Sequence, residues 1–261
     1  MISKSIQLRG LLWREIERYL KVPLQTIATP IVNSILYLLI FGVSLGGSIA
    51  IQHASSYLVF LVPGLIAMAC IRNAFENSSS ALLSQKYFNE LQDLRVTPLT
   101  VGQLCFAKTV GSLTRGIFVA LLTLLVGEGF YWATQGDLLP LKHPLLFIFF
   151  LLFGGMAFAS LGIAVGMWSK SFEHIGAVSS LILLPLIYLG GVFFDLQSMA
   201  PLWQTLSRFN PLFYLIQGVR EAMLGGTRVD LQQYALFAFL FFILCYILAL
   251  FSLKKGARYL R

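Results

Sequence analysis

The feature of this sequence that most constrains its fold is the absence of charge over long stretches. No Lys, Arg, Asp or Glu occurs in residues 22–71, and the same holds for residues 143–169, 174–194 and 231–253. About twenty apolar residues suffice for one helix to cross a bilayer. Only 11% of the residues are charged and 57% are hydrophobic, so the chain is predicted to be an all-α, multi-pass membrane protein.

The chain is expected to form a single transmembrane domain over residues 1–261 with six spans. The first charge-free stretch is too long for one helix, and its Gly, Ser, Gln and His residues between positions 45 and 56 favour an exposed turn. Thr100 and Gln103 fit a capping box at the start of the third span. The expected spans are residues 23–46, 57–80, 103–127, 143–169, 174–194 and 231–253.

The basic residues indicate how the spans are oriented. Thirteen Lys and Arg residues fall on the side that holds both chain ends, counting Lys108 just inside the third span, and four fall on the other side. Because Lys and Arg favour the cytoplasmic side, both termini are expected in the cytoplasm. The net charge of +8 is explained by this bias. No nucleic-acid partner is therefore predicted, since the basic residues do not cluster with exposed aromatic residues.

Residues 3–20 form a basic amphipathic segment before the first span. Its apolar stripe, blurred at one edge by Glu15, favours an interfacial helix lying on the cytoplasmic leaflet. The alternative is a cytoplasmic extension of the first span. The stripe consists of Leu8, Leu12, Ile16 and Tyr19.

Residues 84–97 are predicted to form a short cytoplasmic helix that Pro98 terminates. An aromatic anchor surrounded by charges could dock a soluble partner, whereas the alternative is an ordinary solvated helical loop. The candidate contact residues are Tyr87, Phe88, Glu90, Leu91, Asp93, Leu94 and Arg95.

Residues 198–224 are predicted to form two outer helices before the sixth span. Asn210 and Pro211 resemble a helix start, and Gly225-Gly226 a matching stop. The enclosed helix is too short to cross a bilayer, so we expect a re-entrant hairpin dipping into the outer leaflet; a plain amphipathic surface helix is the alternative. Its candidate site residues are Asn210, Pro211, Phe213, Tyr214, Gln217, Arg220 and Glu221.

Three charged residues lie inside predicted spans. Arg72 and Glu76 are four positions apart and can pair on one helix face, and Arg115 lies on the next, antiparallel span. Charges inside spans usually face protein or water, so we expect an Arg72–Glu76–Arg115 cluster. The alternative is that each side chain snorkels to the cytoplasmic interface.

Small residues and breakers mark further positions in the spans. Gly162 and Gly166 form a small-xxx-small motif, as do Gly42 and Gly46, and such motifs are weak indications of self-association. Pro185 and Gly190-Gly191 predict a kink or an early end in the fifth span.

Motifs for catalysis and metal binding are missing from the sequence. It contains no phosphate-cradling loop, no H-E-x-x-H, no G-x-S-x-G and no C-x-x-C. Cys70, Cys105 and Cys245 lie in apolar stretches without metal-ligand spacing. No catalytic residue, metal site or cofactor is therefore predicted for this chain.

The order of these elements and several short motifs resemble the type-2 ABC exporter permeases. The similarity spans essentially the whole chain, and its most specific parts are the Pro-Leu-Thr stretch at 98–100 and the Asn-Pro helix. The chain looks most similar to bacterial permeases related to drug and lipo-oligosaccharide exporters. The matching segments are residues 62–65, 94–100, 115–118, 188–194 and 210–220.

The resemblance implies a non-catalytic transmembrane subunit of an ATP-driven exporter in the bacterial inner membrane. Two copies, as a homodimer, would form the translocation path, which the outer helices would cap. Two copies of a separate ATP-binding subunit, carrying ATP and Mg, would dock on residues 84–97 as a coupling helix, with residues 3–20 adding to that contact.

The cargo that the resemblance implies is amphiphilic, drug-like, lipid-linked or a glycolipid. One alternative is a secondary transporter or channel that works without ATP. The other is a membrane-bound assembly factor or enzyme, which would need a polar catalytic cluster that the sequence does not show.

Overall fold

The computed structural model describes residues 4–44, 56–90, 99–196, 199–225 and 228–259, and within these ranges every regular element is helical. Six helices are long and apolar enough to span a membrane, which confirms the predicted number. They are Leu24–Val43, Tyr57–Tyr87, Val101–Gln135, Pro144–Trp168, Phe172–Leu189 and Val229–Gly256.

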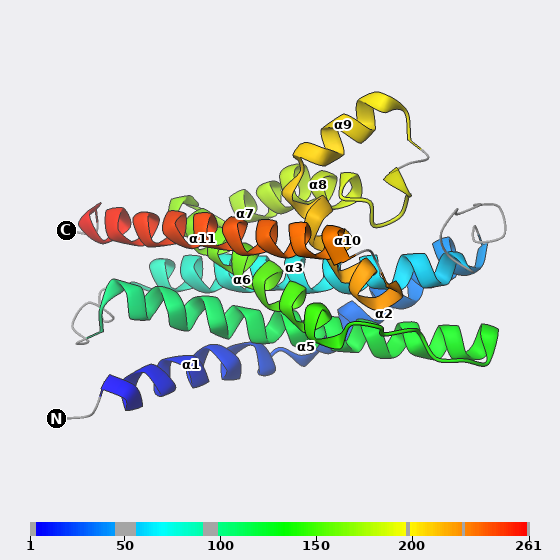
Figure 1. Ribbon diagram of the computed structural model, residues 1–261. Coiled ribbons are helices and arrows are strands. Elements are labelled where there is room, and N and C mark those ends of the chain that lie inside the picture. The colour runs from blue at the N-terminus through cyan, green and yellow to red at the C-terminus, as the bar shows by residue number, and fades with distance from the viewer. Residues whose placement is uncertain (1–3, 45–55, 91–98, 197–198, 226–227, 260–261) are drawn as a thin grey trace.

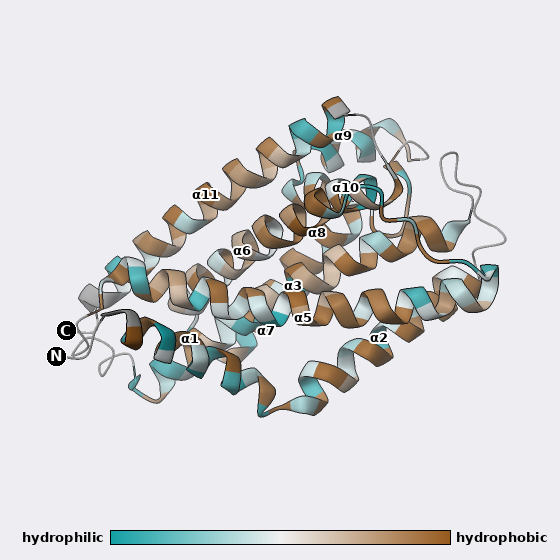
Figure 2. Ribbon diagram, turned by 60° about the horizontal axis from the view of Figure 1, so that its bottom comes forward, coloured by the Kyte–Doolittle hydropathy of each residue, from teal (hydrophilic) through white to brown (hydrophobic). Residues whose placement is uncertain are grey.

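Helix α3 (Tyr57–Tyr87) is the centre of the bundle. It packs against α5 (Val101–Gln135) and α6 (Pro144–Trp168), and α6 is covered in turn by α11 (Arg228–Tyr259). Figure 2 shows apolar colour along these long helices, as expected for spans that meet lipid on the outside and each other on the inside. Within its most apolar stretch, 83% of α3 is buried by the protein itself.

The first and fifth spans are composite helices. The first joins the π-helical η1 (Leu24–Ala28), α2 (Thr29–Tyr37) and the π-helical η2 (Leu38–Ser44). The fifth joins α7 (Phe172–Val178), the π-helical η3 (Ser179–Leu183) and α8 (Leu184–Leu189).

A proline follows two of these widened turns. η1 precedes Thr29-Pro30, and η3 precedes Leu184-Pro185. Proline has no N–H to donate and its ring clashes with the carbonyl four residues earlier, so the preceding turn widens. The kink expected at Pro185 is thus a π turn, and the fifth span ends early at the glycine pair, where Gly191 has φ +84°.

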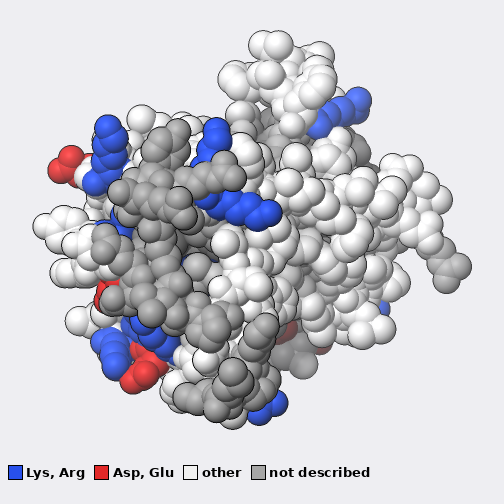
Figure 3. Space-filling view, turned by 90° about the vertical axis from the view of Figure 1, so that its left-hand side faces the viewer, with Lys and Arg blue, Asp and Glu red and all other residues white. Residues whose placement is uncertain are grey.

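Both ends of the described chain lie at the same end of the bundle as the last turn of α3 and the first turn of α5 (Figure 1). We call this the terminal end. Figure 3, which looks onto it, shows Lys and Arg side chains spread around it, with Asp and Glu mainly toward one side. The cytoplasmic location of this end stays a prediction.

Helix α1 (Lys4–Leu20) packs against α5 at the terminal end. Its most buried residues are Leu11, Glu15 and Tyr19. Of the predicted stripe, Tyr19 is buried, whereas Leu8, Leu12 and Ile16 are only partly buried. The predicted stripe was therefore shifted by about one position. The physical reason is Glu15, which lies in the middle of the buried face because it pairs there with Lys108 of α5.

Several predicted boundaries change in the structure. α3 continues past residue 80 to Tyr87, so residues 84–87 belong to the second span and not to a separate helix. The chain then turns at Phe88 and Asn89, which has φ +58°, and helical backbone resumes at Glu90. The capping box of Thr100 and Gln103 is confirmed at the start of α5, which runs on to Gln135.

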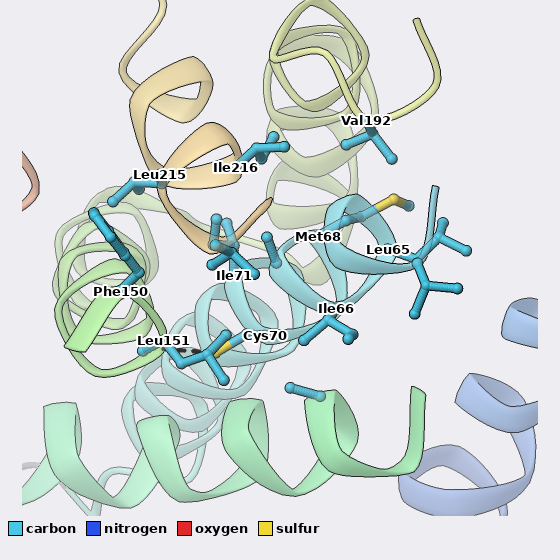
Figure 4. Packing of buried hydrophobic residues seen from close by; sticks show 14 of the residues in the cluster. Leu65, Ile66, Met68, Cys70, Ile71, Phe150, Leu151, Val192, Leu215 and Ile216 are labelled. Atoms are coloured by element: carbon cyan, nitrogen blue, oxygen red, sulfur yellow. Dashed lines mark hydrogen bonds between the residues drawn. The ribbon is translucent and has the colours of Figure 1, made fainter. Parts of the chain in front are cut away.

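Helix α9 (Pro201–Phe209) is followed by α10 (Pro211–Leu224), whose ends lie where the sequence predicted. α10 packs against α3, α6 and α11, and most of its residues are buried. Figure 4 shows Leu215 and Ile216 of α10 beside Phe150 of α6 and Ile71 of α3. The alternative of a plain surface helix is therefore wrong.

The glycines of α6 bring it close to α3. A Cβ at Gly162 would overlap Ser78 Oγ and the Phe75 carbonyl, and one at Gly166 would overlap the Ser79 carbonyl. Gly42 similarly faces Leu58. Gly162, Gly166 and Gly42 therefore serve packing within the chain, and their part in self-association stays a prediction; Gly46 lies outside the described residues.

Candidate functional site

Two adjoining cavities lie between the composite spans and the core of the bundle. The first, of about 230 Å³, is bordered by η1, α2, α3 and α5. The second, of about 510 Å³, lies between α1, η1, α3, α5 and the α7–η3 segment. They share Gln25, Glu76 and Arg115 as lining residues, and both are open on one side. We call them the α2 cavity and the α7 cavity.

The three charged residues predicted to cluster all line the α2 cavity. Arg72 Nε donates to Glu76 Oε1 at 2.8 Å, as predicted, and Ser179 of η3 donates to the same oxygen at 3.2 Å. Arg115 differs from the prediction, because its Nη1 donates to Asn77 Oδ1 at 3.4 Å and it makes no ion pair with Glu76 within 4 Å among the described residues.

Cations outnumber carboxylates around these cavities. Arg18, Arg72 and Arg115 line them, whereas Glu76 is the acidic lining residue. Arg18 Nη2 donates to both the carbonyl and the side-chain oxygen of Asn77 at 2.9 Å. Arg115 is only 5% exposed, and its buried Nε has no hydrogen-bond partner within the part of the chain that the structure describes.

A second buried network, which the sequence did not predict, joins α1 to α3 and α5. Lys108 Nζ donates to Glu15 Oε1 at 2.9 Å and to Gln85 Oε1, and Gln85 Nε2 donates to Glu15 at 3.3 Å. Glu15 and Lys108 are each 1% exposed. Burial alone would raise the pKa of Glu15, but the charges of Lys108 and Arg18 outweigh burial and hold that pKa below its ordinary value.

Lys108, counted in the sequence among the basic residues of the side that holds both chain ends, is thus paired with Glu15 in the interior. A lysine just inside a span and a glutamate on an amphipathic helix were visible in the sequence. Their partnership was not, because 93 residues separate them and no local rule predicts such a contact.

The predicted docking residues lie partly within the described chain. Tyr87 and Phe88 point away from the core and are 74% and 67% exposed. Glu90 accepts a hydrogen bond from Arg14 of α1, and the two side chains form an ion pair. The remaining predicted docking residues, Leu91, Asp93, Leu94 and Arg95, lie outside the described residues.

At the other end of the bundle, Arg220 fixes α10 to the core. Its Nε donates to the Phe60 carbonyl at 3.1 Å, its Nη2 to the Gly191 carbonyl at 2.7 Å and its Nη1 to Gln217 at 2.9 Å. The guanidinium also lies 3.7 Å from the centre of the Phe60 ring. Burial lowers the pKa of Arg220 to about 10, which leaves it charged at neutral pH.

The other predicted residues of this segment surround that anchor. Asn210 caps α10 by accepting from the Leu212 amide at 3.0 Å, and Pro211 occupies the first helical position. Phe213 and Tyr214 pack against Tyr234 of α11.

Glu221 is the unusual residue of α10, since its Oε2 is buried and none of the described residues forms a hydrogen bond with it. Burial first and Asp230 second raise the pKa of this carboxyl to about 7, while Arg220 opposes the shift.

Within the described part of the chain, no three His, Cys, Asp or Glu side chains gather where they could hold a metal ion.

An all-helical bundle with six membrane-length helices and a charged cavity among them defines a multi-pass membrane protein of the transporter type. The sequence pattern of the family described as ABC-2 type transporter matches residues 6–224. The chain belongs to this family.

Two relatives are similar over most of their length. Inner membrane transport permease YadH of Escherichia coli K12 is 33% identical over 258 residues, which cover 98% of this chain and 97% of that protein. Nodulation protein J of Rhizobium leguminosarum bv. trifolii is 26% identical over 220 residues, which cover 82% of this chain and 80% of that protein. The chain is thus a multi-pass inner membrane permease and a transmembrane subunit of an ABC transporter.

Proposed function

We propose that this permease is the membrane half of an ATP-driven exporter. It works as a homodimer, with two copies of a separate ABC ATPase subunit docked at the terminal end, which faces the cytoplasm. ATP and Mg bind to that partner, and this chain contributes recognition and movement. The observation that carries the proposal is that α1 bonds both to the exposed turn after α3, through Arg14 and Glu90, and to Asn77 beside the α2 cavity, through Arg18.

Exposed aromatic side chains at the turn after α3 support the docking of a partner there. Tyr87 and Phe88 pack edge to face with ring centres 5.4 Å apart and expose most of their surface. Clustered aromatic residues of this kind are frequent anchors of protein interfaces. The neighbouring ion pair of Arg14 and Glu90 joins α1 to the same surface. Movement of one docked partner would therefore displace both α1 and the turn after α3.

The buried network transmits a displacement of this surface to the spans. If α1 is pushed, Glu15 moves with Lys108 of α5 and Gln85 of α3, because separating a buried ion pair is costly. Arg18 adds a second link, to Asn77 of α3. α1 continues into η1 and α2, so the wall of the α2 cavity moves with it.

The composite spans support the dimeric arrangement. The chain buries only 28% of the apolar stretch of the first span and 22% of that of the fifth. Both border the open cavities. A second copy packed on this face would close the cavities into a shared path, with α9 and α10 covering its outer end.

The docking step can be tested by co-purification. A co-expressed ABC ATPase subunit should be retained by the tagged wild-type permease. Phe88→Asp should reduce the retained amount at least about tenfold, because a charge replaces an aromatic side chain that the partner would cover. Leu138→Asp is the matched control: Leu138 is also 67% exposed but lies beyond the other end of α5, and its replacement should leave retention unchanged.

Transport separates this function from the rival of a carrier that needs no ATP. Vesicles with the permease and its ATPase should transport only with ATP, and Phe88→Asp should abolish that transport while the permease remains in the membrane. Transport by the permease alone, or equal retention of the ATPase by both variants, would contradict the proposal.

A further inference from the structure

The α2 cavity is amphipathic. One part of its wall is apolar, supplied by Tyr37, Leu65, Met68 and Val119. The rest is polar and includes Asn33, Asn73 and Thr29 together with the charged residues Arg72, Glu76 and Arg115. A cavity that offers both an apolar wall and a charged wall suits a ligand with a polar head and an apolar tail.

The charged wall has an excess of positive charge. Glu76 is already engaged by Arg72 at 2.8 Å and by Ser179 at 3.2 Å. Arg115 contributes a second guanidinium without a carboxylate of its own. Where the α7 cavity joins, Arg18 adds a third; its neighbour Glu15 lies 3.5 Å away and is shared with Lys108.

The burial and the unused hydrogen-bond donors of Arg115 favour a ligand-binding site over a purely structural contact. Its side chain is 5% exposed, its hydrogen bond to Asn77 is long at 3.4 Å, and its Nε has no hydrogen-bond partner among the described residues. A buried guanidinium with unused donors is costly unless something accepts from them. The donor fork of arginine matches carboxylate and phosphate oxygens in particular.

We propose that the α2 cavity binds the anionic head, a phosphate or carboxylate, of an amphiphilic cargo, with Arg115 as its main contact and the tail along Tyr37, Leu65 and Met68. This inference rests on the proposed export function and narrows the cargo class within it. Gln25 on η1 lines this cavity, and Ser179 on η3 donates to Glu76 in its wall, so movement of either composite span alters the head-group contacts.

Binding to the purified permease, without any ATPase, tests this directly. The probes are lysophosphatidate, monoacylglycerol with the same acyl chain, and glycerol 3-phosphate, measured by native mass spectrometry or calorimetry in an uncharged detergent. Lysophosphatidate should bind at least about tenfold more tightly than monoacylglycerol, which lacks the phosphate, and than glycerol 3-phosphate, which lacks the tail.

Variants then locate the site. Arg115→Gln should weaken lysophosphatidate binding about tenfold or more and leave monoacylglycerol binding unchanged, whereas Arg115→Lys, which keeps the charge but loses the planar fork, should weaken it less. Arg208→Gln is the control, because Arg208 is exposed on α9. If Arg115→Gln does not fold, Arg115→Lys carries the test and should still weaken lysophosphatidate binding relative to Arg208→Gln.

The following binding results would contradict the proposed site for an anionic amphiphile. Equal affinity for lysophosphatidate and monoacylglycerol, or equal loss in Arg115→Gln and Arg208→Gln, overturns the anionic head group. Equal affinity for glycerol 3-phosphate and lysophosphatidate leaves only a site for small anions and overturns the amphiphile. Because no ATPase is present, failure here is distinct from failure of the docking experiment.

Discussion

The pairing of Glu15 with Lys108 is expensive to build into a membrane protein. Both side chains are 1% exposed, and each loses its hydration on folding. Hydrogen bonds and a second cation offset this cost: Lys108 donates to Glu15 Oε1 and to Gln85, Gln85 donates back to Glu15 Oε1, and Arg18 Nε lies 3.5 Å from Glu15 Oε2. Since three helices contribute one residue each, the network fixes the position of α1 against α3 and α5.

We predict that Lys108→Met destabilises the permease by about 3–5 kcal/mol, because it leaves a buried carboxylate without its counter-ion. Adding Glu15→Leu should recover most of that loss, since both charges are then gone. Denaturant unfolding of the purified protein, followed by fluorescence, measures the difference. A double variant as unstable as the single one would contradict the pairing.

The control is an exposed ion pair between the last turn of α1 and the residue that follows it. Lys21 and Glu17 are 2.9 Å apart but 71% and 49% exposed, so Lys21→Met should change the free energy of unfolding by less than about 1 kcal/mol. pH gives a second signature. Because the folded-state pKa of Glu15 lies below its ordinary value, its contribution is fully present above that ordinary value and is lost as pH falls through the lowered one.

Sequence reasoning succeeded for residues whose partners lie on the same helix. Arg72 and Glu76 are one turn apart, so geometry alone predicts their pairing. The partners of Arg115 and Lys108 depend on how α1, α3 and α5 pack. No periodicity in one sequence specifies that packing, which is why Asn77, Gln85 and Glu15 were missed as site residues.

At the scale of elements, the ends of helices were predictable where a cap defines them. The bounds of α10 follow from Asn210, Pro211 and Gly225, and the start of α5 from Thr100. The end of α3 was not predictable, because its last turns carry polar residues that continue the helix beyond the apolar stretch. Hydropathy marks where a helix leaves lipid, and a helix can extend further.

Close packing of α6 on α3 gives a prediction at this scale. We expect Gly162→Ala to destabilise the protein by about 1–3 kcal/mol, because the new methyl group would overlap Ser78 and the backbone of Phe75. Gly129→Ala on α5 is the control. Nothing lies within 4 Å of its Cβ position, so helix propensity alone should leave stability unchanged or raise it by up to about 1 kcal/mol.

Thermal unfolding of both variants in one detergent measures these changes. If the two substitutions act alike, α3 and α6 do not approach as closely as described. If Gly162→Ala lowers dimer content but leaves stability unchanged, the glycine serves self-association after all.

At the scale of the whole molecule, the spans differ in how much of their surface the chain covers. The buried share of the apolar stretch is 83% for the second span but 28%, 22% and 28% for the first, fifth and sixth. Lipid can cover an apolar helix, but it cannot satisfy the polar walls of the two cavities. The first and fifth spans border those cavities, whereas α11 packs against α6, away from α2 in the view of Figure 2.

We therefore predict that two copies meet along the first and fifth spans and not along the sixth. Single cysteines replacing Leu181 or Ile182 on η3, which are 75% and 55% exposed, should give a cross-linked dimer with a short bis-maleimide in native membranes. Leu240→Cys and Leu244→Cys on α11 are the controls, since these residues are similarly exposed, at 54% and 56%.

The natural cysteines need not be removed for this experiment, because Cys70, Cys105 and Cys245 are buried and a maleimide does not reach them in the folded protein. Denaturing gels then report a band at twice the 29.1 kDa of the chain. Equal cross-linking at α11 and η3 would mean that the contacts are random collisions in the bilayer. Cross-linking at α11 alone would place the second copy on the other side, where it could not close the cavities, and the shared path would have to be abandoned.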